Sequence, residues 1–297
     1  MRSGSDKEEA VGNEYAHPEM LVSTQWVEEH LDDPEVRVLE VDYAPADAYE
    51  LGHIPGAGLV DWKRDINDPV RRDILSKSQM EELMSRSGVT RATTLVLYGD
   101  MRNWFAAFAL WTFKIYGHSD VRLMNGGRRK WFDEGRAVTE DIPTPTPTDY
   151  RAQGADLGLR ALQPQVFSIL GREDFGLVDV RSPMEFSGEI TAPPEYPNEA
   201  AQRGGHLPGA SSIPWLQAIN DDDTFKSVEE LKELYYPKGI TPNKSIITYC
   251  RIGERSSHTW FVLKYLLGFP SVFNYDGSWS EWGNGVGLPV EKGAAVS

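Results

Sequence analysis

The sequence predicts an α/β protein of two similar domains in tandem, each with a mainly parallel sheet flanked by helices. Residues 98–131 and 249–282 align without a gap at an offset of 151 residues. In both copies a short β-branched run precedes an apolar segment of helical length, and alternating strands and helices favour a parallel sheet. A proline-rich segment lies between the copies. These observations indicate one domain design used twice.

The repeat is carried by glycines and aromatic residues as well as by the apolar pattern. The matching pairs are Tyr98 and Tyr249, Gly117 and Gly268, Val121 and Val272, Gly126 and Gly277, and Trp131 and Trp282. Upstream, His53–Ala57 (HIPGA) matches His206–Ala210 (HLPGA). Because both copies carry this histidine, we expect His53 and His206 to have structural roles. An insertion rich in proline and glutamate, around Ala192–Ala201, is expected to be a surface loop.

The repeat also sets the expected domain boundaries. We place the first domain at residues 19–140 and the second at residues 159–290. Residues 141–158 contain the alternating sequence IPTPTPT, which favours an extended, semi-rigid linker. Residues 1–18 are acidic and polar, lack the apolar core of a secretory signal, and are expected to form a disordered leader.

Composition and charge exclude several classes of function. The 297 residues are 40% hydrophobic and 25% charged, as is typical of globular proteins, and the net charge is −15. This charge argues against nucleic-acid and anionic-membrane partners, and an anionic substrate would need a local positive patch. The longest apolar stretch, around residues 104–116, is too short to span a membrane. One cysteine permits no intramolecular disulfide and no cysteine-based zinc cluster. We expect a soluble cytoplasmic protein.

The expected strands and helices place this cysteine at the end of a sheet. Residues 94–98 (TLVLY) and 245–249 (SIITY) have the composition of buried strands. An apolar helix is expected at about residues 256–267, with Gly268 in the position of a C-terminal cap. Ligands of parallel sheets bind beyond the carboxyl ends of the strands, and Cys250 directly follows one of these strands.

Cys250 begins the loop that joins this strand to the helix. Unpaired backbone N–H groups and the positive end of the helix dipole lower the pKa of a nearby thiol. Arg251 and Arg255 favour the thiolate further and can bind oxyanions. Gly253 is expected to adopt a positive φ, and Glu254 to face solvent or pair with a nearby base. We therefore expect an ionised, solvent-accessible Cys250 that acts as a nucleophile.

The alternative is that Cys250 is a small buried core residue, as free cysteines often are. The strand end, the turn, the two arginines and the helix start around it favour the nucleophile. In the first copy Gly99 and Asp100 stand where Cys250 and Arg251 stand, so the thiol is absent and one charge is inverted. We expect the first domain to be catalytically inert.

Three motifs resemble those of the tandem-domain rhodaneses, a family of sulfurtransferases. Residues 49–57 (YELGHIPGA) resemble the N-terminal signature, residues 272–282 (VFNYDGSWSEW) the C-terminal signature, and Cys250–Arg255 (CRIGER) the six-residue active-site loop. The resemblance covers about residues 20–290. It implies two rhodanese-like domains, of which the second is catalytic.

The resemblance implies a ping-pong reaction in which Cys250 carries sulfur as a persulfide. Thiosulfate would donate the sulfur, sulfite would leave, and cyanide, a small thiol or a thiol protein would accept it, with no metal or organic cofactor. Arg181 and Trp279 are further candidates for the site, although Arg181 could instead pair with Asp179 and Trp279 could pack in the core. The residues implied as substrate-binding are Arg251, Ile252, Gly253, Glu254, Arg255 and Ser256.

Two positions depart from the thiosulfate enzymes of the family. Ile252 stands where they carry a basic substrate contact, and Glu185 stands where they carry an arginine. Arg251, however, is unlike the small uncharged residues of mercaptopyruvate sulfurtransferases, so thiosulfate is the expected donor. A 3-mercaptopyruvate sulfurtransferase and a sulfur-relay protein remain alternatives.

Two functions of other classes are more remote. A phosphatase of the cell-cycle dual-specificity type needs five residues between its cysteine and arginine, whereas four separate Cys250 from Arg255. Because consecutive residues lie about 3.8 Å apart, this difference changes the size of the anion cradle. A tandem module that only binds a partner is the other alternative, and the intact loop argues against it.

Overall fold

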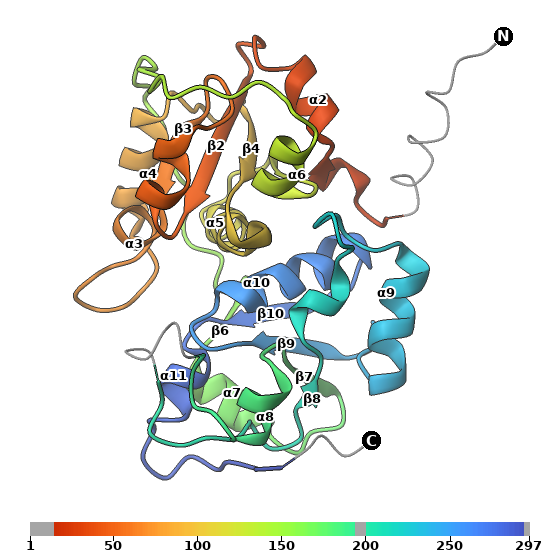
Figure 1. The fold of residues 1–297 in the computed structure, drawn as a ribbon. Coiled ribbons are helices and arrows are strands. Elements are labelled where there is room, and N and C mark those ends of the chain that lie inside the picture. The colour runs from red at the N-terminus through yellow and green to blue at the C-terminus, as the bar shows by residue number, and fades with distance from the viewer. Residues whose placement is uncertain (1–14, 194–199, 294–297) are drawn as a thin grey trace, which may run out of the picture. The chain divides into compact units, whose positions relative to one another are not determined.

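The computed structural model describes residues 15–193 and 200–293, and the chain divides into two compact units (Figure 1). One unit contains residues 19–157 together with 221–225, and the other contains the rest of the described chain. Residues 1–14 of the expected leader and residues 194–199 of the expected insertion lie outside the described residues.

The first unit is built on a five-stranded parallel sheet with the order β1-β5-β4-β2-β3. Its central strands are buried, and α5, whose side chains are nearly all buried, packs against β2, β4 and β5. The strands are β1 Leu21–Val22, β2 Val36–Asp42, β3 Gly58–Asp61, β4 Thr94–Tyr98 and β5 Val121–Met124. The helices are α2 Thr24–Glu29, α3 Trp62–Asp65, α4 Lys77–Arg86, α5 Trp104–Ile115 and α6 Gly127–Asp133.

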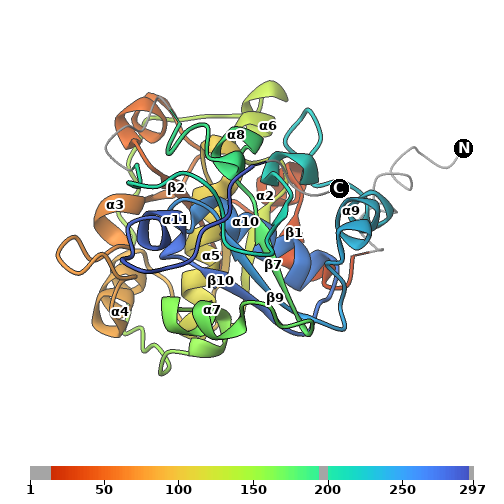
Figure 2. The same cartoon turned by 90° about the horizontal axis from the view of Figure 1, so that it is seen from below.

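The second unit repeats this design, with the strand order β6-β10-β9-β7-β8 and every pairing parallel. β9 and β10 lie side by side in both views (Figures 1 and 2). The strands are β6 Arg160–Ala161, β7 Phe175–Asp179, β8 Ser211–Ser212, β9 Ser245–Tyr249 and β10 Val272–Tyr275. The helices are α7 Gln163–Ile169, α8 Pro183–Ser187, α9 Val228–Tyr235, α10 Glu254–Phe261 and α11 Ser278–Trp282. The predicted pair of similar α/β domains is confirmed.

The helix after β9 starts earlier than the sequence indicates. It was expected at about residues 256–267, but α10 begins at Glu254 and continues as a π-helical turn, η10 Val262–Leu266. The Leu267 N–H accordingly donates to the Val262 carbonyl, and Gly268 then adopts a φ of 69°. The N–H of Phe269 donates to the Leu263 carbonyl, which satisfies a carbonyl at the helix end.

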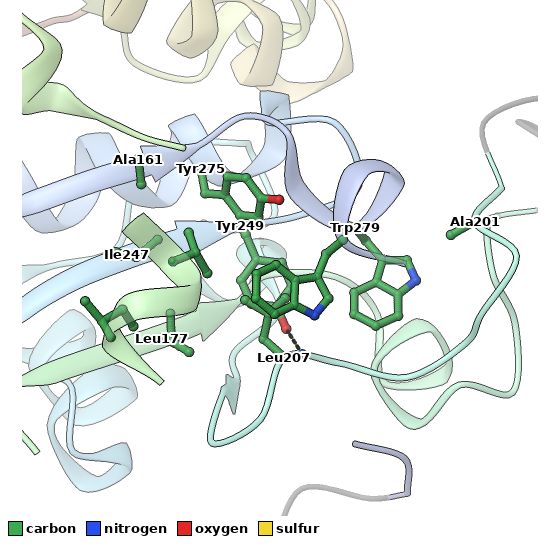
Figure 3. Packing of buried hydrophobic residues seen from close by; sticks show 11 residues of the cluster. Ala161, Leu177, Ala201, Leu207, Ile247, Tyr249, Tyr275 and Trp279 are labelled. Atoms are coloured by element: carbon green, nitrogen blue, oxygen red, sulfur yellow. Dashed lines mark hydrogen bonds between the residues drawn. The ribbon is translucent and has the colours of Figure 1, made fainter. Parts of the chain in front are cut away.

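A cluster of buried aromatic and aliphatic side chains packs among β7, β9, β10, α7 and α11 in the second unit (Figure 3). Trp279 and Trp282 of α11 are both fully buried. The hydroxyl of Tyr249, at the end of β9, accepts a hydrogen bond from the Leu207 N–H at 3.1 Å. The last residue of the strand before Cys250 is therefore fixed by packing and by a hydrogen bond.

The two repeated histidines are held by ring stacking and by contacts to backbone carbonyls. The His53 ring stacks on Tyr49 with a centroid distance of 3.7 Å, and its two nitrogens contact the carbonyls of Tyr49 and Asp141 at 3.0 and 3.1 Å. His206 stacks on Phe186 at 3.6 Å and contacts the Phe186 carbonyl at 2.8 Å. Both rings are thus held by the backbone of their own domain.

Residues of the expected linker and of the end of the expected leader make backbone hydrogen bonds to helical segments. The Thr148 N–H donates to the Ser85 carbonyl at 3.0 Å, so this part of the linker lies against the first unit. The N–H groups of Ala16 and His17 donate to the carbonyls of Leu266 and Tyr265, so these leader residues are ordered against the second unit. In the described ranges, no helix has the length and apolar character needed to cross a membrane.

Candidate active site

The loop after β9 is anchored by the first turn of α11. The carbonyl of Cys250 accepts from the Trp279 N–H at 3.1 Å, and the carbonyl of Arg251 accepts from the Ser280 N–H at 2.9 Å. The Cys250 N–H donates to Ser278 Oγ at 3.0 Å. The C-terminal sequence motif therefore holds the cysteine loop in place through hydrogen bonds. The part that Ser278 plays in this was not predicted from the sequence.

The sulfur of Cys250 lies within the turn that starts α10. The Gly253 N–H donates to Sγ at 3.1 Å, and the Ser256 N–H is a second backbone donor to the sulfur. Gly253 has a φ of 102°, and a Cβ at this position would lie 2.6 Å from Cα of Asp276. Glycine is therefore required here both by the backbone conformation and by the close approach of the neighbouring chain.

A buried polar network connects this turn to the adjacent strand. The Asn274 side chain in β10 donates to the Gly253 carbonyl at 3.0 Å, and Ser256 Oγ lies 2.6 Å from Asn274 Oδ1. Both side chains are fully buried. Asn274 was not identified from the sequence, although an amide side chain inside an otherwise apolar strand is a usable signal, because buried polar groups need partners.

The thiol differs from the sequence prediction in two respects. Cys250 has no exposed surface, so the expectation of a solvent-accessible thiol is wrong for this structure. Burial, together with the Glu254 carboxylate, raises the pKa of Cys250, and the opposing effects of Arg255 and of the Ser256 and Gly253 N–H groups do not reverse the shift. The expected lowering of the pKa is also wrong, and the resting group at neutral pH is the thiol.

Glu254 does not face solvent but lies against the sulfur. It is 1% exposed, and the Cys250 thiol donates to its Oε2 at 3.4 Å. Its other oxygen, Oε1, is 3.7 Å from Nη2 of Arg251 and 3.8 Å from Nε of Arg255. One carboxylate thus contacts the sulfur and both arginines of the loop.

Arg255 is paired with Glu185, the residue that stands in place of a family arginine. The two guanidinium nitrogens donate to the two carboxylate oxygens at 3.0 and 3.1 Å, and both side chains are buried. Burial alone would raise the pKa of Glu185, but the charge and hydrogen bonds of Arg255 outweigh it and lower the pKa to about 2. The cationic groups expected to bind an anionic donor are therefore accompanied by two buried carboxylates.

Arg181 lies in the core of the second unit. Its guanidinium donates to both oxygens of Asp179 and to the Gly205 carbonyl, and it has no exposed surface. The guanidinium carbon lies 4.6 Å from the ring centroid of Trp279. In this arrangement Arg181 packs against Trp279, and the backbone N–H of Trp279 donates a hydrogen bond to the Cys250 carbonyl.

The equivalent loop of the first unit has a different structure. A Cβ on Gly99 would lie 2.3 Å from the Val41 carbonyl oxygen, so the position has no room for a cysteine side chain. Asn103, at the position of Glu254, accepts from the Gly99 N–H at 3.0 Å. A cavity of about 330 Å³ adjoins the loop and is lined by Gly99, Asp100, Met101, Arg102, Arg128, Arg129, Phe132 and Asp133.

Burial, with the neighbouring Asp42, raises the pKa of Asp100 in this loop to about 7. The charge of Arg128 opposes this shift without cancelling it. The loop therefore carries a carboxyl group in place of the arginine of the second unit. Within residues 15–193 and 200–293, no group of three or more histidine, cysteine or acidic side chains is arranged to hold a metal ion.

The family model described as Rhodanese-like domain matches residues 23–134 and 164–284. A protein of Thermus thermophilus named "Sulfur carrier protein TtuD" is 58% identical over 282 residues, which cover 94% of this chain and 99% of that protein. A "Putative thiosulfate sulfurtransferase" of Saccharopolyspora erythraea is 51% identical over 274 residues, 92% of this chain and 96% of that protein.

Solved structures agree with this similarity. The anaerobic ergothioneine biosynthesis enzyme of Chlorobium limicola, in complex with trimethyl histidine, superposes with a TM-score of 0.81 and 28% identity, over 94% of this chain and 71% of that chain. A structure of EanB with a cysteine persulfide and ergothioneine gives a TM-score of 0.82 at 28% identity, over 95% of this chain and 72% of that chain.

Proposed function

This chain belongs to the rhodanese family of sulfurtransferases, and on that premise we propose that it acts as a sulfur relay in which Cys250 receives sulfur as a persulfide and passes it to an acceptor thiol. The observation that carries the proposal is the position of the Cys250 sulfur at the start of α10. There it accepts hydrogen bonds from the N–H groups of Gly253 and Ser256 and feels the positive charge of Arg255. Preorganised backbone donors of this kind stabilise negative charge on a reacting sulfur.

The proposed transfer consists of two displacements at sulfur. The thiolate of Cys250 attacks the outer sulfur of the donor, the sulfur–sulfur bond of the donor breaks, and the electron pair leaves with the rest of the donor. In the second step an acceptor thiolate attacks the outer sulfur of the persulfide, and the electron pair returns to Cys250. No net oxidation occurs, because each step exchanges one bond to sulfur for another.

The burial of Cys250 adds one requirement. Because the side chain has no exposed surface, a donor reaches Sγ only when residues around the loop move. Local openings of this kind are common in proteins and occur with free energies below that of global unfolding.

Thiosulfate sulfurtransferase is the second candidate function, with cyanide or a small thiol as acceptor. It is supported by the name of the relatives at 51% identity and by the position of Arg255, whose charge acts on the Cys250 sulfur. The carboxylates of Glu254 and Glu185 are the feature that favours the relay, because they offset the two arginines that a dianionic donor would need.

The two candidates can be tested together by intact-mass spectrometry after exposure to thiosulfate, to 3-mercaptopyruvate and to a small-molecule persulfide. The relay predicts a gain of one sulfur per chain from the persulfide, absent in Cys250→Ser. A gain from thiosulfate at an equal or higher rate would favour the second candidate. Failure to gain sulfur from every donor, or turnover of a phosphate ester above that of Cys250→Ser, would overturn both.

A further inference from the structure

The charges around Cys250 balance within a small buried cluster. Arg251, Glu254, Arg255 and Glu185 are each at most 6% exposed, and every ion pair among them is 3.8 Å or shorter. Two positive and two negative groups leave no excess positive charge beside the sulfur. A donor carrying two negative charges therefore finds no uncompensated cation in this cluster, and it must also approach the carboxylate of Glu254.

The arginines alone do not account for the position of Glu254. Arg255 already has a bidentate carboxylate partner in Glu185 at 3.0 and 3.1 Å, whereas its Nε is 3.8 Å from Glu254. Glu254 Oε1 is also 3.7 Å from Arg251, beyond hydrogen-bonding distance. Glu254 does accept a hydrogen bond from the thiol of Cys250.

The first domain provides an internal comparison. Its loop has glycine in place of the cysteine, and at the position of Glu254 it has Asn103. The Asn103 amide accepts from the Gly99 N–H at 3.0 Å and donates to the Met124 carbonyl at 2.6 Å, so it serves to hold the loop. A carboxylate thus occurs at this position in the copy that has a thiol, and a neutral amide in the copy that lacks one.

We propose that Glu254 exchanges a proton with Cys250 and with the leaving group of the sulfur donor. It thereby favours donors whose leaving group is a thiolate over dianionic donors such as thiosulfate. The proposal rests on the proposed function, in that Cys250 must carry the persulfide. Glu254 contacts the reacting sulfur directly, so its role is catalytic and does not depend on positioning another group.

The proton balance explains the selectivity. Glu254 takes the proton of the Cys250 thiol, and the thiolate attacks the outer sulfur of a persulfide RSSH. The donor sulfur–sulfur bond breaks, RS⁻ leaves with the electron pair, and Glu254 returns the proton to give RSH. A leaving thiolate with an ordinary pKa near ~8.5 needs this proton at neutral pH. Sulfite leaving from thiosulfate needs no proton to depart, so with this donor Glu254 only deprotonates the Cys250 thiol, and its negative charge opposes the approach of the dianion.

The test uses the full chain and single-turnover rates of sulfur gain by mass spectrometry. In Glu254→Gln, the rate with the persulfide of β-mercaptoethanol should fall by about 100-fold, the low end of general acid–base effects, whereas the rate with thiosulfate should fall by a smaller factor. Glu229→Gln, which removes one negative charge from an exposed position on α9, should leave both rates unchanged. Changes of equal size and direction with the two donors would overturn the proposal.

A second variant separates loss of catalysis from a folding defect. Glu254→Asp keeps the charge but withdraws the carboxylate from Sγ, so the persulfide rate should fall by a larger factor than the thiosulfate rate. A persulfide rate that does not fall in this variant would also overturn the proposal. If no donor places sulfur on Cys250 of the unmodified protein, the proposed function itself fails, and this result is distinct from an equal response to both donors.

Discussion

Removing one partner of the buried ion pair between Glu185 and Arg255 should strongly destabilise the second domain. Glu185→Gln tests this, because the amide oxygen can still accept the hydrogen bonds from Ser182 that cap α8 but cannot balance the charge of Arg255. Lowering the pKa of Glu185 from an ordinary 4.5 to about 2 corresponds to about 3 kcal/mol at neutral pH. Losses of similar size follow removal of one partner of other buried pairs.

The pH dependence follows from the direction of this shift. Because the folded-state pKa of Glu185 is lowered, its contribution is fully present above the pKa of the unfolded chain and is lost as the pH falls from about 4.5 towards 2. The unmodified protein should therefore lose this part of its free energy of unfolding in that range. Glu185→Gln should be less stable at pH 7 and should lack this part of the acid sensitivity.

Urea unfolding at pH 7 and pH 3 measures both effects. Asp174→Asn is the matched control, because it removes a carboxylate from an exposed pair with Arg172 in the same domain and should cause no measurable change. The double variant Glu185→Gln with Arg255→Met should recover part of the loss, since both charges are then absent. Equal unfolding midpoints for Glu185→Gln and Asp174→Asn would refute the reasoning.

Three further changes test the loop and the first domain. Cys250→Ser should abolish sulfur gain and leave the urea midpoint nearly unchanged, and retained sulfur gain would remove the cysteine from the mechanism. Gly253→Ala should cost more stability than Gly209→Ala, because both positions have a positive φ, worth about 1–3 kcal/mol of strain, but only the first Cβ meets the backbone of Asp276. Gly99→Cys should destabilise the first domain and leave the sulfur gain at one per chain, and a second persulfide would contradict the inert first loop.

The parts of the fold that depend on local sequence could be predicted. The strands 94–98 and 245–249 coincide with β4 and β9, because β-branched apolar runs bounded by turns specify buried parallel strands. The π-helical turn at Val262–Leu266 was not predicted, since it depends on packing and not on residue propensities. The hydrogen bonds of the linker to the first domain were missed for the same reason.

The position of the candidate site was predicted from the sequence, but the ion pairs and the protonation state around the sulfur were not. Cys250 lies after β9 as expected, and Gly253 has the expected positive φ. The partner of Arg255 is Glu185, 70 residues away in sequence, so composition and spacing gave no indication of this pair. The raised pKa of Cys250 was missed because the sequence shows the N–H donors of a helix start but not the burial that opposes them.

The most direct test of the account follows isotope-labelled sulfur through one turnover. The protein would be loaded from a labelled persulfide, freed of excess donor, and mixed with a dithiol acceptor, and the peptide that contains Cys250 would be analysed before and after mixing. We expect one label per chain on Cys250, followed by its loss from this peptide and its recovery in the acceptor. A label that stays on Cys250, or that reaches the acceptor equally fast through Cys250→Ser, would contradict the account.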